Sequence, residues 1–458
     1  MGDSTPPLTV QTWARTKFNA TVARNIAHPS LNLPCFINTE VQMTTHSTTV
    51  HSGTDDAALA RETSPTFPTA PAFRQLTRTP LVPEAVLKRH GAYCAIDTRF
   101  RSAARLLQCL WLKDHDIPTA SSARRGGINT GSSFGSILEA GAARAGRNFL
   151  SPAIHRLALQ ELLLREDDAA IDEERLFGNA LSSMPLTFSL FGPLAVDCDL
   201  ATAVFRRLLP DFVHTVEQII FEHSPGRRED RFLKDRTAFD LAVRVITPDG
   251  EPATVFIEVK YSESMEGPAA RMRDRYNEAS RQVRLYRDPD SAILRSLALE
   301  QIWREHMTAQ LAVDHGVTPR AVFMAIGPHL NRRVQAAFRV YEAELLDADQ
   351  REPGRVAFAP LTLETVIEAV ATAGASELAH ALWGRYCDLD RVYRLSMQEI
   401  AGTEVPPDAP PHADSSASIK RALPPVRRRS PSSNRHRTKA SSSACKVAAK
   451  ATSTQEAI

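Results

Sequence analysis

Two short apolar runs joined by a turn constrain the fold of this chain more than any other feature. They are "FDLAVRVI" at 239–246 and "ATVFIEVKY" at 253–261, and the linker between them contains Asp249-Gly250, a strong hairpin signal. Their β-branched and aromatic residues predict paired strands of a buried sheet. Charged residues nevertheless occur inside both runs: Asp240 opens the first, and Glu258 and Lys260 lie in the second.

Strand periodicity places these three charges close together. Side chains alternate along a strand, so Glu258 and Lys260 point to one face. In an antiparallel hairpin, Asp240 lies across from the end of the second strand. Two neighbouring carboxylates repel unless a cation lies between them, and a site made of oxygen ligands favours Mg²⁺ or Mn²⁺. A buried structural ion pair between Glu258 and Lys260 is the alternative.

The surrounding segments predict an α/β protein. Helical spacing marks "DTRFRSAARLLQCLWLKDHDIP" and "SPAIHRLALQELLLRE", the second with Ser151 as cap and Pro152 in its first turn. The Pro- and Gly-broken "RLFGNALSSMPLTFSLFGPLA" predicts packed, irregular structure. The stretch at 199–227 is mostly helical by spacing, with "VEQIIFE" as an alternative strand. "RDRYNEASRQVRLYRDP" and "NRRVQAAFRVYEAELL" predict helices, "AVFMAIGP" a buried strand, and "RVAFAPLTLETVIEAVA" a last strand and helix of the ordered part.

Composition divides the chain into three parts. Residues 1–75 are rich in Thr, Ser and Pro and predict a disordered tail, residues 76–400 carry the α/β pattern, and residues 401–458 form a basic, Pro- and Ser-rich tail. Six scattered cysteines without a CxxC pair argue against a zinc knuckle or disulfide framework. No apolar run has membrane-spanning length and no signal core is evident, so we expect a cytoplasmic protein, with a nuclear address encoded by the basic tail if the source is eukaryotic.

The residues that carry the charge pattern resemble a known family. An Asp, a gap of 17 residues and "EVK" is similar to the pattern of the PD-(D/E)XK nuclease superfamily. The longer string "FEHSPGRREDRFLKDRTAFDLAVRV…FIEVKYSE", with "NALSSMPLTFSLFGPL" upstream, resembles a family of bacterial restriction-endonuclease-like proteins over about residues 85–400. Phe239 stands where the superfamily name has Pro. The resemblance implies a central mixed sheet flanked by helices, preceded by a helical extension.

It also implies roles for individual residues. Asp240 and Glu258 would be metal ligands, with the Val259 carbonyl as a third, and Lys260 would orient or activate the attacking water. Glu222 matches a carboxylate that such nucleases often carry just before the core strands; its alternative is a solvated acid before a loop.

Gln282 lies in the helix after the catalytic strand, where related enzymes often place a polar accessory residue. Its alternative is an ordinary surface glutamine. Six arginines between Arg271 and Arg287, with Tyr276 and Tyr286, form either a phosphate-contacting face or a solvated charged helix.

These features together predict a nuclease that hydrolyses phosphodiester bonds with Mg²⁺, for which Mn²⁺ can substitute. The partner that we expect is nucleic acid, with DNA favoured over RNA; a homodimer is left open and no membrane is involved. Two alternatives remain: a catalytically idle nuclease fold that binds nucleic acid, and a structural or interaction protein with a buried ion-pair cluster. The presence of Asp, Glu and Lys together favours the enzyme.

Overall fold

The computed structural model describes residues 73–120, 134–169, 171–266, 272–346 and 354–402. Their centre is a five-stranded sheet with strand order β1-β2-β3-β4-β5: β1 (Thr215–His223), β2 (Phe239–Ile246), β3 (Pro252–Val259), β4 (Ala321–Gly327) and β5 (Ala357–Thr362). β1, β2 and β3 pair antiparallel, whereas β3, β4 and β5 pair parallel. The predicted mixed sheet of an α/β fold is therefore confirmed.

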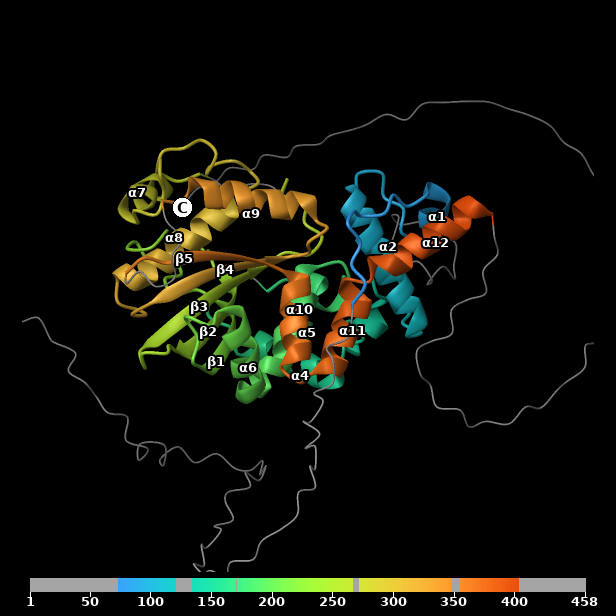
Figure 1. The fold of residues 1–458 in the computed structure, drawn as a ribbon, viewed down its shortest axis with the longest axis horizontal. Helices are drawn as coiled ribbons and strands as arrows, with labels where there is room; N and C mark the ends of the chain where they lie inside the picture. Colours follow the sequence, from blue (N-terminus) through green and yellow to red (C-terminus); the bar gives the residue numbers. More distant parts are fainter. Residues whose placement is uncertain (1–72, 121–133, 170, 267–271, 347–353, 403–458) are drawn as a thin grey trace, which may run out of the picture. The chain divides into compact units, whose positions relative to one another are not determined.

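Helices cover both faces of this sheet (Figure 1). One face packs against α7 (Asp274–Gln282), α8 (Glu300–Asp314) and α9 (Arg332–Glu344). On the other face, α5 (Ser183–Val196), α6 (Cys198–Leu208) and α10 (Leu363–Thr372) contact the strands. The same hydrophobic core also contains α2 (Arg99–Asp114), α4 (Pro152–Leu163) and α11 (Ser376–Tyr386). The remaining short or peripheral elements are α1 (Glu84–Arg89), α3 (Ala140–Arg144), the π-helix η1 (Glu174–Gly178) and α12 (Leu389–Ala401).

The hairpin between β2 and β3 forms as the sequence predicts. Gly250 takes a φ of +83°, a conformation that side chains with a Cβ rarely adopt, and its N–H donates to the Thr247 carbonyl at 2.9 Å. The register pairs Leu241 with Ile257. Asp240 consequently lies at the edge of the sheet where β3 ends.

The helix caps also follow the sequence. The Ser151 side chain accepts from the Ile154 N–H at the start of α4, which has Pro152 in its first turn. Of the two readings for residues 199–227, both apply in part, because α6 ends at Leu208 and "VEQIIFE" lies in β1.

The prediction of irregular structure before residue 198 was wrong. Residues 183–196 form α5, a helix with most of its residues buried and with Pro193 near its end. Pro185 lies in the first turn, where a helix needs no N–H donor, so that proline does not oppose the helix. Burial on all sides removed the amphipathic period that would have identified it.

Two further differences concern the ends of the pattern. The ordered part continues past the predicted last helix into α11 and α12. The predicted disordered tails, 1–75 and 401–458, fall outside the described residues except at their inner edges. Within the described ranges, no single helix is long and apolar enough to cross a membrane; α5 and α6 pass that test only as a pair, which is bent by 117°.

Candidate active site

Three neighbouring strands bring three carboxylates to one edge of the sheet. Phe221 pairs with Leu241 and His223 with Phe239, so Glu222 of β1 lies across from Asp240. The β2–β3 register in turn sets Asp240 beside Glu258. Directly opposite residues in a sheet project to the same face. Strand register therefore brings Asp240 and Glu258 together and places Glu222 near enough for its charge to act on Asp240.

Asp240 is tied to the end of β3 through the backbone. Its Oδ2 accepts the Val259 N–H at 2.8 Å, which places the Val259 peptide directly beside the carboxylate. The Lys260 N–H that follows donates to the Ile326 carbonyl of β4 at 2.7 Å. Both ends of this peptide segment are thus fixed by neighbouring strands.

Lys260 and Glu258 form a buried ion pair. The Lys260 Nζ lies 2.5 Å from the Glu258 Oε1, and both residues are almost fully buried. Nζ also donates to the Gln301 Oε1 at 2.8 Å. An ammonium group has three N–H donors, so these two bonds leave one for a further acceptor.

Helix α8 contributes two residues that the sequence analysis did not single out. The Gln301 Nε2 donates to the Glu258 Oε1 at 2.8 Å and to the Glu305 Oε1 at 2.7 Å. Glu305 is 1% exposed, and its Oε2 has no hydrogen-bond partner. Gln301 is exposed, so the cluster reaches solvent on the side of α8.

The cluster is buried and contains more carboxyl groups than cations, and both features shift its pKa values. Burial, followed by the negative charge of Glu258, raises the pKa of Glu222 to about 7. Burial and the charges of Glu258 and Glu222 hold the pKa of Asp240 well above its usual range. Burial and Glu258 do the same for the pKa of Glu305.

Lys260 is shifted in the direction that keeps it charged. Burial alone would lower the pKa of the ammonium, but the negative charges of Glu258, Glu305 and Glu263 outweigh burial and raise it. One fixed cation therefore faces several carboxylates, and one carboxylate oxygen of Glu305 is unpaired. Both observations fit a site that accommodates a second positive charge.

The expected metal ligands are all oxygen donors. In the described part of the chain, no group of three or more His, Cys, Asp or Glu side chains is arranged to hold a metal ion. The expected set, Asp240, Glu258 and the Val259 carbonyl, contains only two such side chains and would need water for its remaining ligands. Oxygen-only ligands completed by water suit Mg²⁺.

Gln282 does not join this cluster. It is exposed at the end of α7, and its Oε1 accepts from Arg275 at 3.0 Å. Gln301, on the next helix, provides the amide that we expected from Gln282. A signal for it existed in "EQIWREHMTAQLAVD": apolar residues at helical spacing with Gln301 and Glu305 one turn apart.

Most of the described arginines around α7 form hydrogen bonds with other groups of the protein. Arg275 donates to the Phe232 carbonyl, Arg281 to Asp290, and Arg287 to the Leu345 carbonyl. Tyr276 and Tyr286 are buried in the core. The solvated or structural reading of this segment is therefore favoured over a phosphate-contacting face.

Comparison with known protein families places the chain. A family model described as the PD-(D/E)XK nuclease superfamily matches residues 95–388, which is more than half of the chain and includes every residue of the cluster. No curated protein and no solved structure matched it in the corresponding comparisons. The mixed sheet, with its Asp and Glu-x-Lys on adjacent strands, agrees with the restriction-endonuclease-like fold. The chain belongs to the PD-(D/E)XK nuclease superfamily.

Proposed function

We propose that this protein is a metal-dependent nuclease that hydrolyses phosphodiester bonds in nucleic acid, with DNA as the favoured substrate. The observation that carries the proposal is the clustering of Asp240, Glu258 and Lys260 at one sheet edge, with more carboxyl groups than cations. A structural ion-pair network has no need for carboxylates that raise one another's pKa.

Asp240 and Glu258, with the Val259 carbonyl, would hold Mg²⁺. Such an ion, when bound, stabilises negative charge on the phosphate and lowers the pKa of its water. The protein's own residues do the rest. Gln301 holds Glu258 and Lys260 in fixed orientation through its two amide ends. The third N–H of Lys260 is then available to position the attacking water or a phosphate oxygen.

Glu222 has a separate part in the proposal. With a pKa of about 7, its carboxyl exchanges a proton with water near neutral pH. Its backbone takes a φ of +50°, an uncommon conformation for a residue with a side chain. We assign it to the acceptance of a proton released in the site.

Cations lie beside the edge that carries the cluster. A cavity of about 640 Å³ adjoins Thr237, just before β2, and is lined by Arg228 and Arg236 among others. Arg236 has its nearest carboxylate, Asp168, at 3.7 Å and is more than half exposed. A polyanionic strand that reaches Asp240 would pass these side chains.

One observation favours a second candidate, a nuclease fold that binds nucleic acid without cleaving it. The Lys260 ammonium is already bonded to Glu258 and Gln301, which is also how a closed structural network would look.

Incubation of the purified full-length protein with plasmid DNA separates the two candidates. If the protein is a nuclease, plasmid DNA is cleaved in the presence of Mg²⁺ or Mn²⁺ and is not cleaved when a chelator removes the metal. The same assay with RNA in place of DNA tests the choice of substrate. If the protein binds DNA but does not cleave it with any divalent metal, the binding protein replaces the nuclease as the favoured function.

A further inference from the structure

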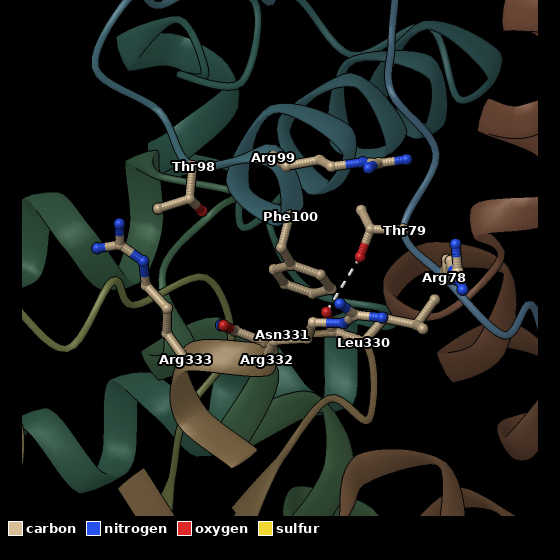
Figure 2. Close-up of a pocket in the computed structure, with 9 residues that line it drawn as sticks. All are labelled: Arg78, Thr79, Thr98, Arg99, Phe100, Leu330, Asn331, Arg332 and Arg333. Atoms are coloured by element: carbon tan, nitrogen blue, oxygen red, sulfur yellow. Dashed lines mark hydrogen bonds between the residues drawn. The ribbon is translucent and has the colours of Figure 1, made fainter. Parts of the chain in front are cut away.

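A cavity of about 520 Å³ opens between the starts of α2 and α9, and its lining is basic. Four arginines border it (Arg78, Arg99, Arg332 and Arg333), whereas no Asp or Glu is among the lining residues. Figure 2 shows that they come from three segments: the chain before α1, the first residues of α2, and the first residues of α9. Residues far apart in the sequence thus supply one concentrated positive charge.

Three of these arginines are unneutralised. Arg333 pairs with Glu266, but within the described residues Arg78, Arg99 and Arg332 have no carboxylate partner. All three are exposed. Like charges gathered around one cavity repel, so an anion that enters it is favoured.

The backbone adds to this preference. Thr98 caps α2 by accepting from the Arg101 N–H, and Asn331 caps α9 by accepting from the Val334 N–H. Both capping residues line the cavity. The N-terminus of a helix carries a partial positive charge and suits phosphate, and here two long helices begin at the same cavity.

The cavity is joined directly to the candidate active site. The Asn331 Nδ2 donates to the Tyr261 carbonyl at 3.0 Å and to the Glu263 carbonyl at 3.1 Å. Tyr261 directly follows Lys260. Lys260 and Glu263 are three residues apart, so at most about 10 Å separates them, which corresponds to about three nucleotides along one strand of a duplex.

We propose that this cavity binds a phosphate group of the nucleic-acid strand that the neighbouring site cleaves, a few nucleotides from the scissile bond. The inference rests on the proposed function for its substrate. The phosphate would be either a 5′-terminal monoester or an internal diester, and arginine recognises both through paired N–H donors.

The test uses binding rather than cleavage. Asp240→Asn protein is the background, so that DNA stays intact, and Arg99→Ala and Arg332→Ala are compared in it. Arg339→Ala is the matched control: it removes the same charge from an exposed position of α9, seven residues or about 10 Å further along the helix. Affinity for a short DNA duplex is measured against salt concentration.

We expect Arg99→Ala and Arg332→Ala to weaken binding about tenfold, as the loss of one charge-assisted hydrogen bond does, and to reduce the salt slope by about one. Arg339→Ala should change neither. A neutral methylphosphonate placed at successive DNA positions then locates the contact. At one position it should weaken binding of the Asp240→Asn background but not of Arg332→Ala in that background, because the two changes remove the same interaction.

These measurements distinguish a terminal from an internal phosphate, and they test the cavity proposal separately from the nuclease proposal. Loss of affinity on changing a 5′-phosphate to a 5′-hydroxyl identifies a terminal group, and coupling at an inner position identifies a diester. If the arginine variants match Arg339→Ala at every DNA position, the cavity is not a phosphate site, even if the wild-type protein cleaves DNA. If coupling is found but the wild-type protein never cleaves, the cavity stands and the nuclease proposal fails.

Discussion

At the end of β3, the two faces of the sheet bury different kinds of polar groups. On one face, Glu258 and Lys260 meet α8 in a cluster with excess negative charge and an unpaired oxygen on Glu305. On the other face, the Tyr261 hydroxyl accepts from Gln108, which is bonded to Arg385. Lys260 and Tyr261 are consecutive residues, so the two faces share one stretch of backbone and differ only in their side-chain partners.

The second face is a network of uncharged acceptors around Arg385. Every nitrogen of the Arg385 guanidinium donates a hydrogen bond, to Gln108 at 3.2 Å and to the Asn148 carbonyl and side chain at 2.8 and 2.7 Å. Arg385 is fully buried and also lies over the Trp111 ring. A buried network whose acceptors are uncharged protein groups specifies a structure, whereas a cluster with more carboxyl groups than cations has capacity left for a ligand or a reaction.

The largest expected effect comes from a change in the carboxylate cluster. Asp240→Asn should reduce DNA cleavage on the order of 10³-fold or more, because a ligand charge is lost. Without divalent metal the same variant should be no less stable than the wild-type protein, because it avoids burial of a charged carboxylate and its repulsion with Glu258 and Glu222. Plasmid cleavage and thermal unfolding measure the two effects. Cleavage at the wild-type rate would remove Asp240 from the site.

A change in the Arg385 network should affect the stability of the fold rather than cleavage. Arg385→Met should destabilise the fold by about 3 kcal/mol, since it leaves three buried acceptors without this donor: the Gln108 Oε1, the Asn148 carbonyl and the Asn148 Oδ1. Cleavage per folded molecule should change little. Denaturant unfolding is the measurement, with exposed Arg339→Met as a control expected within about 0.5 kcal/mol of wild type. A stable Arg385→Met protein would mean that the network does not hold the fold.

Lys260 tests whether the ion pair belongs to the chemistry or to the fold. Lys260→Ala should lower turnover by about 10²-fold, as expected for one lost transition-state contact, and should leave Mn²⁺ affinity in place. Single-turnover cleavage and metal titration distinguish these quantities. Metal affinity that falls as steeply as the rate would contradict the assigned role and favour a structural pair.

The smallest effect concerns pH. Because the pKa of Glu222 is raised to about 7 from its usual 4.5, the folded protein holds this proton more tightly than the unfolded chain. In metal-free protein this contribution to stability is complete below about pH 4.5 and is lost as the pH rises to 7. Glu222→Gln should remove that decline, on the order of 2 kcal/mol after allowance for solvent. Parallel stability–pH curves for the two proteins would show that Glu222 is not shifted.

The sequence by itself determined the sheet edge and the residues on it. Alternation along a strand is a local property, and Asp249-Gly250 fixed the turn, so Asp240, Glu258 and Lys260 could be brought together from the printed letters. The family pattern on those letters led to Glu222, which the structure places in the same row.

Only the tertiary structure decided which helix faces that edge. Gln301 lies 43 residues after Glu258, and no local rule indicates that α8 rather than α7 packs there. The same holds for the basic cavity, whose arginines come from α2, α9 and the chain before α1. It also holds for α5, whose apolar and proline-broken sequence becomes helical because it is buried. Periodicity reports how a segment is exposed, whereas contacts between distant segments depend on how all the buried surfaces fit together.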